Sequence, residues 1–208
     1  MSHWDTSFNS AVAALMAECS KRELSRAMAI EKLQRRLDAQ VPFTEIERAV
    51  SKLVEEGYIS DIRFAAAFTR DKLNFSGWGP KKIEQKLLEA GVSKEIAAAA
   101  IEQESELVER ALKKLLASKR VEIEKRYQKK AEQYSEQLNR LQEELTKGIE
   151  EKHNEMPLRR KMYTLQTKIK TLDTQAKKAL ITFALQRGFT IEQINSALSA
   201  LNENRDIC

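Results

Sequence analysis

The sequence predicts an all-α fold, built from tandem three-helix-bundle repeats, with the third repeat interrupted by a long antiparallel helical hairpin. Three observations lead to this prediction. Apolar residues recur at helical spacing, Ser or Thr residues with glycines mark the ends of these stretches, and similar helix–turn–helix stretches occur three times. The 208 residues include only three prolines and six glycines, and 32% are charged, which also favours helix. Because a helix pair cannot bury its apolar face alone, we expect the units to stack into an elongated, curved body.

The first unit is predicted to span residues 1–57 and to include an N-terminal tail. Its first helix is expected at residues 8–18. Ser20 and Glu23 fit a capping box, and apolar residues follow at helical spacing as far as Leu37. Thr44 and Glu47 form a second capping box, ahead of a helix that ends at Gly57.

The second unit is predicted to span residues 58–105. Asp61 is expected to cap a helix over residues 61–74. Pro80 fits the first turn of the next helix, where its missing N–H costs nothing. That helix is expected to end at Gly91, and Ser93 to cap the last helix of the unit.

The third unit is predicted to combine residues 106–118 with residues 173–208. Its second part, LITFALQRGFTIEQINSAL from Leu180, is similar to IEQKLLEAGVSKEIAAAAI from Ile83 in the second unit. Both stretches read as a helix, a short turn with glycine, a Ser or Thr cap and another helix. The first helix of this unit is therefore separated from its partner helices by an insertion.

Residues 119–172, the basic segment, are predicted to form the hairpin. Apolar residues recur at heptad spacing from Tyr127 to Leu145 and again from Leu158 to Ala176, which places the tip between residues 146 and 157. The segment holds 14 Lys and Arg against 9 Asp and Glu, whereas the rest of the chain is balanced. This excess favours a nucleic acid or an acidic protein surface as partner, and the alternative is a solvated helix face. The candidate binding residues are Lys125, Arg126, Lys129, Lys130, Arg159, Arg160 and Lys161.

The residue types that catalysis or metal binding would need are sparse. His3 and His153 lie far from either cysteine, Cys19 or Cys208, and the spacing offers neither a metal site nor a catalytic triad. The stretch SGWGP lacks the Gly-Lys-Ser/Thr of a phosphate-binding loop. We therefore expect no enzymatic activity, no metal and no cofactor. Neither a secretion signal nor an apolar run of membrane-spanning length is present, so we expect a cytoplasmic protein that is not bound to a membrane.

Two stretches carry a resemblance to a known family: GYISDIRFAAAFTRDKL at residues 57–73 and GWGPKKIEQKLLEAGVS at residues 77–93. Together they resemble the central signature of the RecX family. The basic segment departs from the compact third repeat of that family. The matching positions read mainly as core and turn residues, and those that define the scaffold are Gly57, Tyr58, Asp61, Phe64, Gly79, Pro80, Ile83, Leu87 and Gly91.

The resemblance implies a non-enzymatic regulator that binds the nucleoprotein filament of the RecA recombinase in DNA repair and recombination, most often as an inhibitor. The implied partners are RecA and single- or double-stranded DNA, and we expect a monomer. Basic residues near the signature are expected to line one concave face, although a salt-bridged helix surface is the alternative. These candidates are Arg35, Arg36, Arg63, Arg70, Lys81, Lys82 and Lys86. Two rival functions remain open: a direct DNA-binding protein, and a coiled-coil adaptor for another protein.

Overall fold

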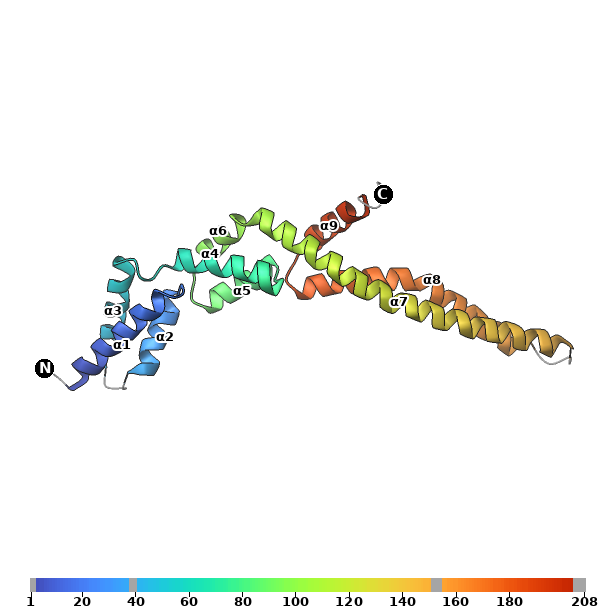
Figure 1. Ribbon diagram of the computed structural model, residues 1–208, viewed down its shortest axis with the longest axis horizontal. Helices are drawn as coiled ribbons and strands as arrows, with labels where there is room; N and C mark the ends of the chain where they lie inside the picture. Colours follow the sequence, from blue (N-terminus) through green and yellow to red (C-terminus); the bar gives the residue numbers. More distant parts are fainter. Residues whose placement is uncertain (1–2, 38–40, 151–154, 204–208) are drawn as a thin grey trace. The chain divides into compact units, whose positions relative to one another are not determined.

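The computed structural model describes residues 3–37, 41–150 and 155–203, and every regular element in these ranges is a helix (Figure 1). The all-α prediction is confirmed. Contacts divide the chain into two compact units: unit 1 comprises residues 1–111 and 187–190, and unit 2 comprises residues 112–186 and 191–208. The helices in chain order are α1 (His3–Cys19), α2 (Arg26–Arg36), α3 (Phe43–Glu55), α4 (Asp61–Asp71), the π-helix η1 (Lys72–Ser76), α5 (Pro80–Glu89), α6 (Lys94–Glu102), α7 (Ser105–Glu150), α8 (Met156–Gln186) and α9 (Ile191–Glu203).

Helices α1, α2 and α3 share one hydrophobic core in unit 1. Leu15 on α1, Leu33 on α2 and Val50 on α3 are fully buried there. Burying a leucine side chain stabilises a fold by roughly 1.5–3 kcal/mol, so these side chains fix how the three short helices pack. The apolar spacing found in the sequence thus marks the buried Leu33 on α2 and the buried Ile46, Val50 and Leu53 on α3, whereas Ala27 and Val54 at the same spacing are exposed.

The helix starts in this bundle differ from the predicted capping boxes. The N-cap of α2 is Ser25, which accepts a hydrogen bond from the Met28 N–H, whereas Ser20 donates to the Ala17 carbonyl at the end of α1. Helix α3 begins at Phe43, after Pro42, so Thr44 lies inside it and is not its cap. The capping-box pattern was therefore wrong at both sites, because several nearby Ser, Thr and Pro residues can begin a helix.

Helices α4, α5 and α6 form the rest of the helical body of unit 1, with α6 packed against both α4 and α5. Ile83 and Leu87 on α5 are fully buried, and Phe64 on α4 is 8% exposed, so their predicted core roles are confirmed. The helix expected over residues 61–74 ends at Asp71 and continues as the wider turn η1, which Gly77 closes in the left-handed region at φ +59°.

Unit 2 contains most of α7 together with α8 and α9. Helix α8 packs against α9, and α7 runs beside α8 (Figure 1). Leu112, Leu116 and Ile123 are buried on α7, and Leu165 and Leu172 are buried at predicted seam positions of α8. The expected tip includes residues outside the described ranges, and His153 and Cys208 also lie outside them. The hairpin, the repeat division and its boundaries therefore stay predictions.

Candidate functional site

The signature residues around Gly57 tie helices together at their ends. Gly57 follows α3 with φ +78°, a conformation that glycine adopts without strain. Ser60, and not Asp61, is the N-cap of α4, since its side chain accepts a hydrogen bond from the Arg63 N–H. Asp61 is the first helical residue, and its carboxylate accepts a hydrogen bond of 2.8 Å from the Arg26 N–H at the start of α2. Tyr58 is 39% exposed.

Arg63 holds the turn that precedes its own helix. Its guanidinium lies 3.0 Å from a Glu23 carboxylate oxygen and donates to the Gly57 carbonyl at 2.8 Å. A second, longer bond of 3.4 Å reaches the Tyr58 carbonyl. Because Arg63 makes these contacts with Glu23 and the turn, a structural role is favoured for it.

Gly79 lies against the loop between α8 and α9. Its N–H donates to the Arg187 carbonyl at 2.6 Å, and the Lys81 N–H donates to the Gly188 carbonyl at 3.1 Å. A Cβ on Gly79 would lie 2.5 Å from backbone atoms of Gly188 and Phe189. The φ of Gly79 is −91°, which is not the left-handed conformation that a glycine in a turn often adopts. The residue is small because a second backbone passes close by. Pro80 occupies the first turn of α5 as predicted.

Gly91 lies against a side chain of α2. It has φ +78°, and a Cβ there would lie 2.3 Å from the Ala27 side chain on α2. Ser25, the fully buried N-cap of α2, donates a 2.6 Å hydrogen bond to the Ala90 carbonyl, next to Gly91 in the chain. These contacts join the end of α5 to the start of α2 within unit 1. Ser93 caps α6 as predicted, accepting from the Ile96 N–H.

Five of the seven basic candidates in unit 1 form ion pairs with carboxylates of the same unit. Arg63 is one of them, and the other pairs are Arg35 with Glu31, Arg36 with Glu18, Arg70 with Glu104 and Lys86 with Glu89. Lys81 and Lys82 have no carboxylate partner among the described residues. Because an ion pair offsets the charge that an anionic partner would meet, these two lysines are the stronger binding candidates.

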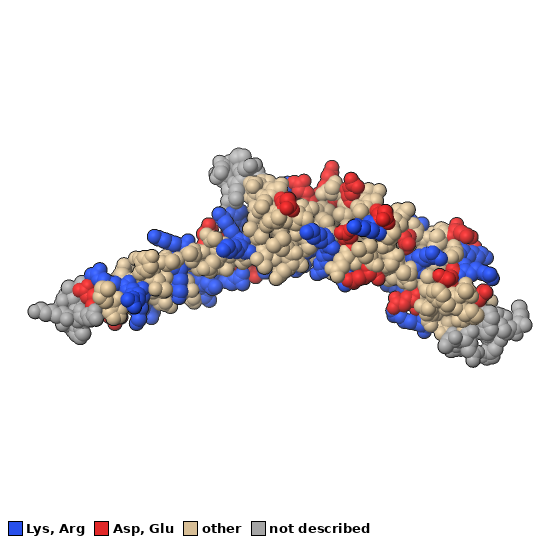
Figure 2. Space-filling model, turned by 180° about the vertical axis from the view of Figure 1, so that it is seen from behind, with Lys and Arg blue, Asp and Glu red and all other residues tan. Residues whose placement is uncertain are grey.

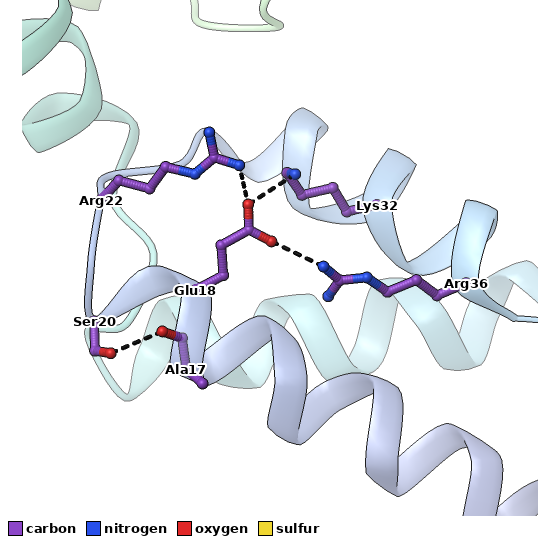
Figure 3. Close-up of polar contacts among 6 residues, drawn as sticks. All are labelled: Ala17, Glu18, Ser20, Arg22, Lys32 and Arg36. Atoms are coloured by element: carbon purple, nitrogen blue, oxygen red, sulfur yellow. Dashed lines mark hydrogen bonds and ion pairs between the residues drawn. The ribbon is translucent and has the colours of Figure 1, made fainter.

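Glu18 gathers the cations at the junction of α1 and α2 (Figure 3). Its carboxylate bonds to Arg22, to the Lys32 ammonium at 2.8 Å and to the Arg36 guanidinium at 3.0 Å. The hydrogen bonds from Arg22 and Lys32 lower the pKa of Glu18 to about 2. Arg36 is therefore committed to the packing of α1 against α2, which its sequence position did not reveal.

The Trp78 patch consists of Lys72, Phe75, Trp78, Lys81 and Lys82. The Lys82 ammonium lies 4.6 Å and the Lys72 ammonium 5.6 Å from the centre of the Trp78 ring, within the range of cation–π attraction. Phe75, in η1, is 85% exposed. An exposed phenylalanine among lysines suits a partner that offers an apolar pocket with an acidic rim. The sequence prediction included the two lysines after Pro80 but missed Phe75, whose only signal was an aromatic residue in a loop.

The predicted cations of the basic segment have varied surroundings. Arg126 and Lys130 flank the Tyr127 ring at 5.6 and 5.1 Å, and Arg159 pairs with Glu155. Lys125 and Lys129 are exposed on α7, and Arg160 and Lys161 line surface hollows on α8. Lys and Arg side chains are spread along this helix pair (Figure 2).

A groove between α7 and α8 brings together residues that are distant in sequence. Its volume is about 420 Å³, and no carboxylate of the described residues lines it. Arg140 and Lys168 were missed by the sequence prediction, although Lys168 follows the candidate Lys161 by seven residues and therefore lies on the same face of its helix. The lining residues are Gln137, Arg140, Leu141, Lys161, Thr164, Leu165 and Lys168.

Other classes of site have little support. Among the described residues, no three His, Cys, Asp or Glu side chains are grouped so that they could hold a metal ion. Burial raises the pKa of the Cys19 thiol, which opposes formation of the reactive thiolate. Within the same ranges, no helix has the length and apolar character needed to cross a membrane.

The chain is similar to known proteins over much of its length. Residues 60–101 match the family model described as RecX, second three-helix domain, so the match includes the Trp78 patch. The regulatory protein RecX of Listeria welshimeri is 29% identical over 182 residues, which cover 76% of this chain and 63% of that protein. The one from Oceanobacillus iheyensis is 34% identical over 85 residues, 38% of this chain and 31% of that protein. The chain therefore spans less than two thirds of the length of these curated relatives.

The crystal structure of RecX from Lactobacillus salivarius superposes with a TM-score of 0.62 at 16% identity, covering 95% of this chain and 97% of that one. A match of that extent takes in at least part of the 119–172 segment, which the sequence had set apart from the family pattern. At this identity the likeness concerns the fold.

Proposed function

The chain belongs to the RecX family, and on that premise we propose that it is a non-enzymatic regulator that binds the RecA nucleoprotein filament and limits its activity. The observation that carries the proposal is the match over residues 60–101, which contain most of the signature and the whole Trp78 patch. Such a regulator would act where the filament forms, in the cytoplasm. RecA and the DNA within the filament would be its partners.

The Trp78 patch is the part of unit 1 best suited to contact RecA. Lys81 and Lys82 are the two unit 1 candidates without a carboxylate partner among the residues described, and Phe75 exposes most of its ring. Exposed aromatic side chains with nearby cations are enriched where protein interfaces gain most of their binding energy. We therefore propose that Phe75 enters an apolar pocket of RecA while the lysines meet its acidic rim.

The test measures the ATPase activity of RecA on single-stranded DNA as the full chain is added. We expect inhibition by the natural sequence, and a loss of inhibition by about tenfold or more in concentration for Phe75→Ala. Ile62→Ala is the matched control, because Ile62 is also exposed, at 66%, in the same matched region. An unchanged ATPase at several-fold molar excess of the chain would count against the proposed function. Equal effects of the two variants would count only against the Trp78 patch.

A coiled-coil adaptor is the second candidate, favoured by the heptad spacing of Leu165 and Leu172, which are buried on α8. An adaptor would bind its partner without any change in RecA activity, so the same ATPase measurement separates the two functions.

A further inference from the structure

We propose that the groove between α7 and α8 binds a single-stranded nucleic acid, with Arg140, Lys161 and Lys168 holding its phosphates. The groove lies wholly within unit 2. The proposal goes beyond the RecA contact of the Trp78 patch and stands without it.

The charge of α8 is the first argument. Between residues 156 and 172 it carries five Lys and Arg and no Asp or Glu. Arg159 is paired with Glu155, but no carboxylate partner is seen for Lys161 or Lys168 in the ranges that the structure describes. Unpaired cations gathered on one side of a helix attract polyanions and gain free energy by releasing the counterions of the phosphates.

The placement of the cations is the second argument. Lys161 and Lys168 are two helical turns apart on the same face, about 10 Å along α8. Arg140 reaches the same groove from α7, where the Gln137 amide adds a hydrogen-bond donor. The Thr164 hydroxyl donates to the Arg160 carbonyl, so the Lys, Arg and Gln side chains are the donors left for a phosphate.

The groove also offers surface for bases. Leu141 is half-buried and presents apolar surface between the cations, whereas Leu165, which also lines the groove, is only 9% exposed. The Tyr134 ring, with the Lys168 ammonium 5.7 Å from its centre, extends this surface along α7 by two turns from Leu141. Proteins that bind single strands combine a cationic groove with such ring and apolar platforms.

A chain-like ligand fits better than a compact anion. A second hollow of about 440 Å³, which includes Arg160, adjoins the groove and shares Lys161 and Thr164 with it. The cations therefore follow α8 as a track. A duplex keeps its bases stacked inside and gains nothing from the apolar surface of the groove. Every nucleotide of a single strand carries a ring for the Tyr134 surface, whereas an acidic peptide carries one only at its aromatic residues. A flexible single strand uses both features.

The experiment measures binding of a labelled thymidine oligonucleotide to the full chain by fluorescence anisotropy, without RecA, over a range of salt concentrations. The variant Arg140→Gln, Lys161→Gln, Lys168→Gln removes three phosphate contacts. Each contact on a single strand contributes about 0.7 to the slope of log K against log salt, so we expect the slope to fall by about 2. At about 0.1 M salt this corresponds to binding about 100-fold weaker.

The matched control, Lys114→Gln, Lys147→Gln, Lys178→Gln, removes the same charge from exposed positions on the same two helices that do not line the groove. We expect it to bind within about fivefold of the natural sequence, because exposed charges a Debye length away are largely screened. A duplex of equal length should bind more weakly than the single strand. Equal losses in both variants, or equal affinity for the duplex, would overturn the proposal.

Capture of RecA without DNA separates this proposal from the proposed function. If the groove variant loses RecA while it keeps the oligonucleotide, the groove meets an acidic protein surface, and the nucleic-acid proposal is wrong. If RecA is never captured but the oligonucleotide binding depends on the groove, the RecA contact fails and the groove proposal stands.

Discussion

Gly79→Ala should destabilise the protein because the added Cβ meets a second backbone and not a flexible side chain. The Cβ would lie 2.5 Å from the Gly188 carbonyl carbon and from the Phe189 nitrogen. The backbone of Gly79 itself, at φ −91° and ψ 170°, suits alanine well. The whole effect therefore comes from the contact with the loop between α8 and α9.

The expected loss has two sources. Overpacking of this kind costs about 1–3 kcal/mol. Displacing the loop also breaks the bonds from the Gly79 and Lys81 N–H groups to the Arg187 and Gly188 carbonyls, each worth about 1 kcal/mol net. A shift of the loop that relieves the clash also breaks these hydrogen bonds, so the two costs are not fully additive. We expect the free energy of unfolding to fall by about 2–4 kcal/mol in total.

Urea unfolding followed by circular dichroism measures this loss. Gly57→Ala is the matched control, since a Cβ there meets no atom of the part of the chain that the structure describes within 4 Å, and only the φ of +78° opposes it. We expect that control to lose about 1 kcal/mol. A loss for Gly79→Ala no larger than for Gly57→Ala would refute the close backbone contact.

Three further substitutions test local contacts. Glu18→Gln should lower the free energy of unfolding by roughly 1–2 kcal/mol at neutral pH, a figure discounted for the exposure of Arg22. In urea unfolding, the difference from the natural sequence should vanish as pH falls from about 4.5 through about 2, because the lowered pKa stabilises the fold only while Glu18 is charged. Ser25→Ala should cost about 2–3 kcal/mol by thermal unfolding, since it removes both an N-cap and a buried bond to Ala90, and a loss below about 0.5 kcal/mol would contradict this. Thr69→Val should raise the free energy of unfolding by about 1 kcal/mol and so raise the unfolding temperature, because the fully buried Thr69 hydroxyl has no hydrogen-bond partner among the described residues. A lower unfolding temperature would show that the hydroxyl has a partner.

Local patterns in the sequence predicted the features that depend on near neighbours. The helical spacing of Phe64, Ile83 and Leu87 identified core residues, and Pro80 and Ser93 identified helix starts correctly. These features follow from periodicity and from backbone groups a few residues away. Ser20 failed as a cap because Ser25, five residues later, competes for the same role and is held by Ala90, a partner 65 residues distant.

The candidate site depended on contacts between distant residues, which no spacing rule gives. Arg36 and Arg70 were binding candidates in the sequence, with a salt-bridged surface as the alternative, and the structure pairs them with Glu18 and Glu104. Arg140 and Lys168 meet only because α7 and α8 lie side by side. The segment composition showed that cations were in excess, and the structure shows which of them lack carboxylates around them.

The most direct test of the proposed regulator is its retention on RecA filaments. Single-stranded DNA is immobilised, coated with RecA in the presence of a slowly hydrolysed ATP analogue, and compared with bare DNA as a matrix for the full chain. We predict retention on the filament at chain concentrations at least about tenfold below those needed on bare DNA, since a protein contact adds to any contact with phosphates. Equal retention on the two matrices would contradict the claim that RecA is the partner.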